Sequence, residues 1–451
     1  MHELTKLIRD DMVPALGVTE PGAIAFCVAK ARTLIGGELK HLHVAMNSGM
    51  YKNAFTCGIP NSEETGTVFA AALGYVAGNA ERGLEALAEL SPEDSLAAEA
   101  LVRAGRVSIE LSGITSRIFI EARLETTEGT AGVTIRDRHT NITKMTVNGE
   151  TVFVSEEENG GEDSAPEAGG EHLIHRYTFA QILDYVNTVP AEEIAFVQEA
   201  YTMNLALFRE GLESPRTTFA RKLRAMNGCS ILSGDELRTA SLLCNGAIEA
   251  RVMGLDKPAM SITGSGAHGI IATLPLYAVC RINRIPEEKL HRATMLSYLI
   301  CTYIKEYSGR LSAFCGCGIA AGTGMAVAVC YLKGDTPAQM EYVLNNMASS
   351  ITGMICDGGN QGCTMKGVVA CAAAFESVAL ALGGVHIDSR HGINGETPEQ
   401  TMRNMGLIAS PGMVMTEETI VGIQESKSSQ TQREDHVEVS LNNLSRKEPR
   451  T

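Results

Sequence analysis

Four cysteines lie in two glycine-rich segments about forty residues apart. The first segment carries Cys315 and Cys317, and the second carries Cys356 and Cys363. Thiolates are soft ligands that suit iron–sulfur clusters, and glycine lets backbone amides come close to inorganic sulfur or to a bound anion. The four cysteines therefore suggest a metal-cluster site, although free cysteine is also among the residues most often buried in protein cores.

Other catalytic patterns fit the chain less well. It contains neither a G-x-x-x-x-G-K-[ST] phosphate loop nor an H-E-x-x-H zinc helix. Residues 316–321 imitate a dinucleotide-binding turn, but the residues before them do not form a hydrophobic strand. The cysteine spacing is not that of a zinc ribbon, and residues 264–266 do not form a nucleophile elbow. A cluster site remains the chemistry that these segments favour.

The composition describes a globular chain of 451 residues. The formal net charge of −15 argues against nucleic acid or an anionic membrane surface as the main partner. Twelve cysteines without a secretory segment at the N-terminus indicate a reducing cytoplasm. The longest apolar stretches, residues 318–332 and 368–385, are short or interrupted, so buried helices fit them better than membrane spans.

The residue patterns predict an α+β fold. Residues 105–155 alternate apolar and polar side chains, and Asn148-Gly149 is a strong hairpin signal, which together predict a small antiparallel sheet. From Thr178 onward helical periodicity dominates. We therefore expect three regions: an α+β N-terminal domain at residues 1–175, a mainly helical domain at residues 176–424, and a polar tail at residues 425–451.

Several separate segments resemble the bacterial and archaeal L-cysteine desulfidases, which are related in turn to the α-chain of iron–sulfur-dependent L-serine dehydratases. The segments run in the family's order and cover roughly residues 5–420. They are Ala15–Pro21, Lys52-Asn53 with Gly58–Pro60, His139–Ile142, Ser261–Ile270, Ser308–Cys315 and Gly353–Lys366.

The resemblance implies a cytoplasmic lyase that eliminates the β-substituent of a small L-amino acid. Cysteine would give sulfide, ammonia and pyruvate, and serine would give water in place of sulfide. In that family three cysteines hold a [4Fe–4S] cluster and leave one iron open. The open iron resembles a Lewis acid that takes the substrate's thiol or hydroxyl together with a carboxylate oxygen.

Two of the family's three ligand positions carry over, at Cys315 and Cys356. At the third, the family reads Gly-Cys-Thr-Glu-Pro, whereas this chain has Val18, and valine cannot bind iron. Three outcomes are open: another thiol replaces the missing ligand, a cluster binds weakly through two thiols, or the chain holds no cluster. In the last case it works differently or binds a small amino or hydroxy acid without the parent chemistry. The candidate replacement thiols are Cys57, Cys317 and Cys363.

Polar residues in the same segments are the candidates for contacts with the substrate. The glycine-flanked Ser265 can present backbone amides to a carboxylate, and Arg310 can bind a carboxylate or tie two loops together. The catalytic candidates are Lys52, Asn53, Ser265, His268 and Arg310. The substrate-binding candidates are Asn141, Gly264, Gly266, Ser312 and Asp357. A small-molecule amino acid is the expected partner, and the Ala- and Gly-rich chain is compatible with a homodimer.

Overall fold

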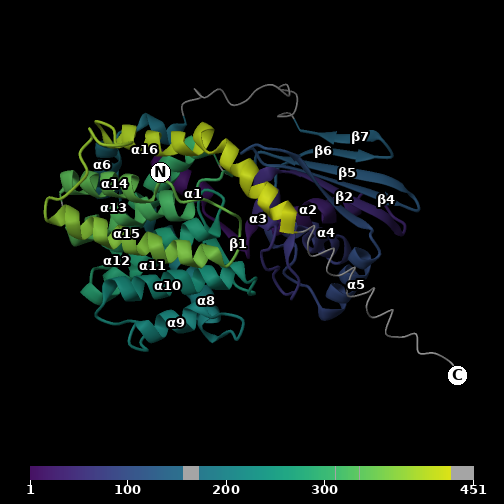
Figure 1. Cartoon of the computed structure of the whole chain (residues 1–451), viewed down its shortest axis with the longest axis horizontal. Helices are drawn as coiled ribbons and strands as arrows, with labels where there is room; N and C mark the ends of the chain where they lie inside the picture. The colour runs from purple at the N-terminus through teal and green to yellow at the C-terminus, as the bar shows by residue number, and fades with distance from the viewer. Residues whose placement is uncertain (156–171, 310, 335, 428–451) are drawn as a thin grey trace.

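The computed structural model has two parts, one built on a sheet and one made of packed helices (Figure 1). The α+β class predicted from the sequence is confirmed, with the six-stranded sheet in the N-terminal part and a mainly helical C-terminal part. The structure describes residues 1–155, 172–309, 311–334 and 336–427. The candidate residue Arg310 and residues 428–451 of the expected tail lie outside the described residues.

The sheet of the N-terminal part has six strands in the order β3-β2-β4-β5-β6-β7. These strands are β2 (Leu39–Asn47), β3 (Val107–Gly113), β4 (Phe119–Thr126), β5 (Gly129–Arg136), β6 (Ile142–Val147) and β7 (Glu150–Val154). The predicted hairpin is confirmed, because β6 and β7 pair through a turn at Asn148-Gly149 in which both residues have positive φ.

The expectation of a wholly antiparallel sheet was wrong at one edge. β2 and β3 run parallel, while the other four neighbouring pairs are antiparallel. Parallel neighbours need a long crossover, and here the chain between β2 and β3 forms helices. Alternation within a strand reports which face is buried and carries no information on the direction of its neighbour. The helices of this part are α2 (Thr19–Arg32), α3 (Ser48–Ala54), α4 (Gly66–Val76) and α5 (Pro92–Arg103).

The C-terminal part is a helical assembly whose central helices are apolar on all sides. In α13 (Gly322–Lys333) only Tyr331 and Lys333 are not fully buried, which confirms the expectation for residues 318–332. The other helices are α6 (Phe179–Thr188), α7 (Ala191–Ile194), α8 (Gln198–Glu213), α9 (Phe219–Met226), α10 (Glu236–Val252), α11 (Gly266–Asn283), α12 (Glu287–Ser308), α14 (Pro337–Ile351), α15 (Gly362–Leu382) and α16 (Pro398–Leu407).

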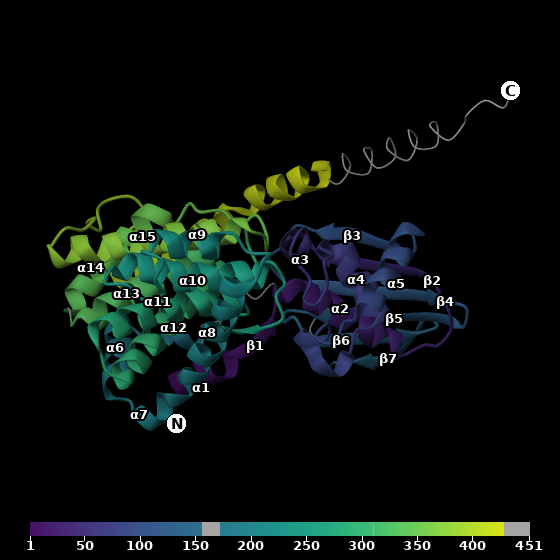
Figure 2. The ribbon, with the colours of Figure 1, turned by 90° about the horizontal axis from the view of Figure 1, so that it is seen from below.

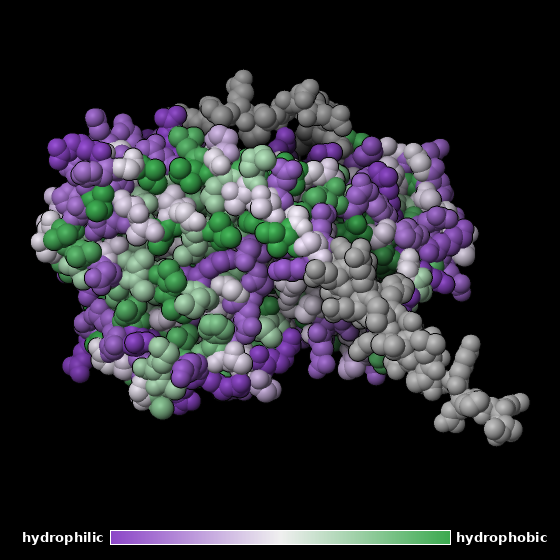
Figure 3. Space-filling model, viewed as in Figure 1, coloured by the Kyte–Doolittle hydropathy of each residue, from purple (hydrophilic) through white to green (hydrophobic). Residues whose placement is uncertain are grey.

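The apolar helix α15 is less buried than its sequence predicts. It buries one face and exposes Met365, Val369 and Leu380 on the other, in the region where Figure 3 shows apolar surface. Among the described residues, α15 is the one helix whose length and composition would suffice to cross a membrane.

Both ends of the described chain connect the two parts. The first helix, α1 (Glu3–Asp11), packs on α12, and strand β1 (Val13–Leu16) pairs antiparallel with β8 (Pro258–Ser261). At the other end, a C-terminal helix (residues 414–427) runs from the helical part toward the sheet-bearing part (Figures 1 and 2). The segment that begins after β1 is therefore held beside the helical part, where the cysteine segments lie.

The contact between α12 and α13 generates a stability prediction. A Cβ on Gly324 would lie 2.2 Å from the carbonyl oxygen of Ser297 on α12. We expect Gly324→Ala to lower the free energy of unfolding by about 1–3 kcal/mol, because the two helices must separate. Gly422→Ala is the control, since an added Cβ there meets nothing within 4 Å on an exposed helical position. Urea unfolding that ranks the control as the less stable variant would contradict the packing.

Candidate active site

The two cysteine segments are joined by a short antiparallel ladder. Phe314 and Ile355 form a β-bridge. On either side of it, the Cys315 amide donates to the Met354 carbonyl at 3.0 Å and the Cys356 amide donates to the Ala313 carbonyl at 2.6 Å. Residues that flank a bridged pair point to the same face of a ladder. The side chains of Cys315 and Cys356 therefore lie on one face as diagonal neighbours.

All four thiols of the two segments lie within electrostatic range of one another. The Cys317 thiol donates a hydrogen bond to Cys315, and this bond lowers the pKa of Cys315 below its ordinary value. The same bond and burial raise the pKa of Cys317, and the charges of Cys315, Cys363 and Cys356 raise it further. Burial also raises the pKa of Cys363, to about 11. The structure thus gathers four cysteine side chains at a single place, with the lowered pKa at Cys315.

A lysine and an aspartate complete the charge balance of this place. Lys366, in the second turn of α15, forms an ion pair with the carboxylate of Asp357. Burial alone would lower the pKa of Lys366, but the neighbouring Cys363, Cys356 and Cys315, together with Asp357, outweigh it and raise the pKa. Lys366 is therefore a permanent cation beside the thiols, and Asp357 serves as its partner.

The loop around Asn53 reaches the second cysteine segment. The Oδ1 atom of Asn53 lies 3.8 Å from the sulfur of Cys356, and its Nδ2 donates to Glu20 at 2.8 Å. Its carbonyl accepts from the amide of Gly359 at 3.0 Å. A Cβ on Gly359 would lie 2.7 Å from Cγ1 of Val18. Val18, where the sequence resemblance leads us to expect a third cysteine, thus packs directly against the segment of Cys356.

Cys57 is the most deeply enclosed of the candidate thiols. It is fully buried, and its sulfur contacts the carbonyl of Ala54 at 3.5 Å. Burial raises the pKa of Cys57, and the negative charge of Glu20 raises it further. Cys57 is accordingly a protonated thiol bonded to its own loop, whereas Cys317 and Cys363 lie with Cys315.

Lys52 forms a buried ion pair with the C-terminal helix. Its side chain has no exposed surface, and its Nζ donates to the Ser312 carbonyl at 2.9 Å and to Glu417 Oε2 at 2.6 Å. The side chain of Gln424, from the same helix, donates to the Asp357 carbonyl at 3.0 Å. Residues 414–427 therefore hold both the Lys52 loop and the second cysteine segment in place.

His268 lies in the first turn of α11 with a defined tautomer. Its Nδ1 is 2.5 Å from the hydroxyl of Thr263, which itself donates to the Ile262 carbonyl. With the Thr263 proton directed at Ile262, Nδ1 is assigned as the protonated nitrogen, which leaves a lone pair on Nε2. A Cβ on Gly316 would lie 2.6 Å from Nε2, so this lone pair faces the first cysteine segment. Burial lowers the pKa of His268, and the charge of Lys305 lowers it further.

The remaining sequence candidates occupy different places. Asn141 donates to the Arg136 carbonyl at 3.2 Å and closes the turn between β5 and β6. Its neighbour His139 instead comes within 3.9 Å of Glu20 Oε1. Ser265 precedes α11 and makes no capping bond with its side chain.

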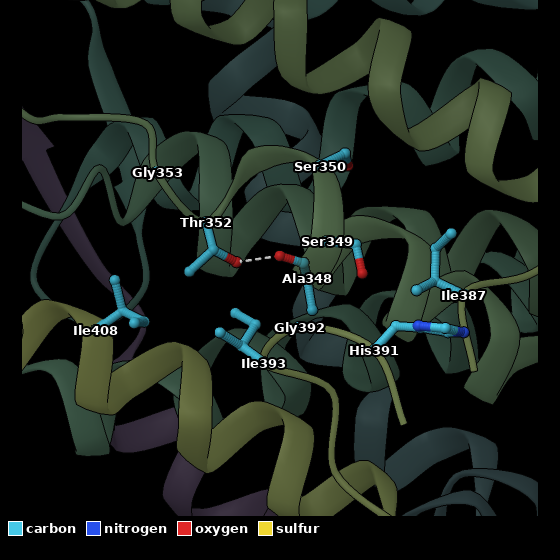
Figure 4. Close-up of a pocket in the computed structure, with 10 residues that line it drawn as sticks. All are labelled: Ala348, Ser349, Ser350, Thr352, Gly353, Ile387, His391, Gly392, Ile393 and Ile408. Carbon is cyan, nitrogen blue, oxygen red and sulfur yellow. Dashed lines mark hydrogen bonds between the residues drawn. The ribbon is translucent and has the colours of Figure 1, made fainter. Parts of the chain in front are cut away.

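Two cavities border these residues. One of about 460 Å³ is lined by Thr19, His139, Ser261 and Gly264 among others, and one of about 230 Å³ includes Ser312 and Glu417 in its wall. A third cavity of about 480 Å³ lies at the end of α14, where Thr352 donates to the Ala348 carbonyl (Figure 4). No cysteine lines this third cavity, and we assign it no part in the site.

The comparisons with known proteins place the chain in a family. The family model described as the serine dehydratase alpha chain matches residues 81–422. The chain belongs to the serine dehydratase alpha chain family. UPF0597 proteins match almost end to end. One from Clostridium botulinum is 39% identical over 94% of this chain and 99% of its own length, and one from Clostridioides difficile is 34% identical over 93% and 98%. Another from Caldanaerobacter subterraneus is 36% identical over 94% and 98%.

Members of the serine dehydratase alpha chain family are generally associated with iron–sulfur clusters, so the donor set needs a test. Four soft thiol donors gathered at one place fit such a cluster in their chemistry. Among the described residues, no group of three or more His, Cys, Asp or Glu side chains is already arranged around a metal position. To bind a cluster here, the cysteine side chains would therefore have to rotate toward a common centre.

Three side chains of the site are absent from the sequence candidates: Glu20, Lys366 and Glu417. Glu20 and Lys366 lie within segments that carry the family resemblance, so those segments contained the signal. Glu417 lies in a helix with an ordinary pattern, and only the folded chain brings it to the site.

The Lys52–Glu417 pair generates a second prediction. We expect Lys52→Met or Glu417→Gln to lower the free energy of unfolding by about 3–5 kcal/mol, because each leaves a buried partner without compensation. The double variant Lys52→Met/Glu417→Leu should recover most of that loss. Arg82→Met, which breaks an exposed pair with Glu89, should cost less than about 1 kcal/mol. Urea unfolding in which the double variant is as unstable as the sum of both single variants would contradict a coupled buried pair.

Proposed function

We propose that this chain is a lyase that eliminates the β-substituent of a small L-amino acid, either cysteine or serine. The single observation that carries the proposal is the convergence of the Cys315 and Cys356 segments on the loop of Asn53. Membership in the serine dehydratase alpha chain family supports a related dehydratase-type role. The names of the UPF0597 relatives state no activity, so the substrate and the reaction are our proposal.

The reaction needs a base for the α-proton of the substrate. His268 is suited to this, because its Nε2 is unprotonated and faces the first cysteine segment. When the proton leaves Cα, its electron pair forms the Cα–Cβ double bond, and the Cβ–S or Cβ–O bond breaks with its pair on the leaving atom. The resulting enamine rearranges to an imine, which water hydrolyses to pyruvate and ammonia. Cysteine thus gives sulfide, and serine gives water.

The leaving atom needs stabilisation of its negative charge. Cys315 and Cys356 would hold a [4Fe–4S] cluster, with Cys317, Cys363 or Cys57 in the place that Val18 vacates. When bound, such a cluster supplies a Lewis acid for the leaving sulfur or oxygen. The neighbouring side chains hold the thiols in place. The Lys366 cation balances the negative charge of the thiolates, and Asn53 orients Cys356.

Product formation tests the proposal directly. We expect protein reconstituted with iron and sulfide under anaerobic conditions to release pyruvate from L-cysteine or L-serine. Cys315→Ser and Cys356→Ser should each reduce the rate of pyruvate release at least about 100-fold, because serine is a poor ligand for iron. Changes to the residues around a bound metal commonly cause losses of about this size. Cys229→Ser is the control, since Cys229 is exposed and lies outside both cysteine segments. A chain that retains iron and full activity in both site variants would refute the assignment.

A gain-of-ligand variant gives an independent readout. Val18→Cys should raise the iron retained per chain, because residue 18 packs against the segment of Cys356. Val28→Cys is the matched control, since it adds a buried thiol to the same helix away from that segment. Equal iron content in the wild type and in both variants, measured after desalting without oxygen, would contradict a cluster at this position.

A second candidate function is a clusterless protein that binds a small amino or hydroxy acid without the elimination chemistry. Val18 in the ligand position favours it, as does the lack of a prearranged metal group among residues that the structure describes. Saturable binding of L-serine by colourless protein that releases no pyruvate, even after reconstitution, would select this candidate.

A further inference from the structure

One buried cation in the site has no carboxylate within ion-pair distance among the residues that the structure describes. Arg251, near the end of α10, is only 4% exposed. Its Nη2 reaches the Thr19 hydroxyl at a marginal 3.5 Å, and its Nε has no hydrogen-bond partner among the described residues. No ion pair recorded in the described part of the chain includes it. Burying a cation in this way is unfavourable unless an anion compensates it.

The guanidinium of Arg251 lies at the start of a long helix. A Cβ on Gly266, the first residue of α11, would lie 2.8 Å from Arg251 Nε. Helix α11 has eighteen residues, and the Ser265 side chain does not cap it. The first amides of a helix lack partners within the helix and attract anions. Two independent features, an unpaired buried guanidinium and an open helix N-terminus, therefore face the same spot.

This spot adjoins both the cavity and the proposed base. Thr19 and Gly264 line the cavity of about 460 Å³, and the Thr19 hydroxyl donates to the Gly264 carbonyl at 3.4 Å. His268 follows Gly266 by two residues in the same helical turn. An anionic group held at Gly266 would thus lie within one helical turn of the base, as the carboxylate of an amino acid must when its α-proton is removed.

We infer that Arg251, together with the N-terminus of α11, binds the α-carboxylate of the substrate. The identity of the ligand as an amino acid rests on the function proposed above. Lys52, a buried cation among the sequence candidates, already has its counter-ion in Glu417. Arg251 has no ion-pair partner among the described residues, so the negative charge opposite it can come from a ligand. The planar guanidinium presents a fork of N–H donors that matches a carboxylate.

Binding to the protein without iron tests this inference. L-serine and L-serinamide are titrated into the wild type and Arg251→Met, and the dissociation constants are measured by calorimetry. We expect L-serine to bind the variant at least about 30-fold more weakly, because a buried charge partner is lost. L-serinamide, which has no carboxylate, should bind both proteins equally weakly. Equal affinity of both proteins for L-serine, or no binding of L-serine to the wild type, would overturn the inference.

Stability without ligand separates this role from a purely structural one. Arg251→Met should be as stable as the wild type or more stable, because it removes an uncompensated buried charge. Arg292→Met is the control, since Arg292 is paired with Glu288 and with the Val186 carbonyl, and it should lose stability. If Arg251→Met loses as much stability as the control, Arg251 is structural and the inference fails.

The activity assay keeps this inference distinct from the proposed function. If L-serine binding depends on Arg251 but no substrate yields pyruvate, the elimination proposal fails and the carboxylate site stands. If pyruvate is released with an unchanged KM in Arg251→Met, the elimination stands and the carboxylate site is wrong.

Discussion

The short ladder between residues 313–315 and 354–356 is the constraint on which the site depends. These segments belong to two loops with little regular structure of their own, and two backbone hydrogen bonds fix their register. A slip of one residue would turn one of the two cysteine side chains to the opposite face. With the register fixed, Cys315 and Cys356 share a face, and the loop of Asn53 can contact one of them.

Glycines allow three other segments to close around this ladder. Gly359 admits Val18, Gly316 admits His268, and Gly358 lies so close to the Lys52 carbonyl that a Cβ there would be 2.3 Å away. At these three glycines the backbone itself is in close contact with neighbouring segments, as side chains are in a protein core. Charged side chains buried in so densely packed a site need partners of opposite charge. The described residues supply such partners for Lys52 and Lys366. Arg251 has no ion-pair partner among the described residues, which is why we infer a ligand for it.

The sequence predicted local structure and the gathering of cysteines, because both leave local signals. The β6–β7 hairpin follows from Asn148-Gly149, and the thiol cluster follows from soft ligands among glycines. The parallel pairing of β2 with β3 could not be predicted, since strand alternation does not encode direction. The roles of Glu417 and Arg251 could not be predicted either, because each reaches the site from a helix distant in sequence. Each role depends on which side chain the fold places opposite the charge.

The central claim is that the sulfurs of Cys315 and Cys356 face one small-molecule site. A crystal structure of anaerobically reconstituted protein, with data on both sides of the iron absorption edge, tests it most directly. We expect an anomalous peak adjacent to both sulfurs and on the side that the His268 imidazole faces. Iron bound elsewhere, or two sulfurs that point to opposite sides of the ladder, would contradict it.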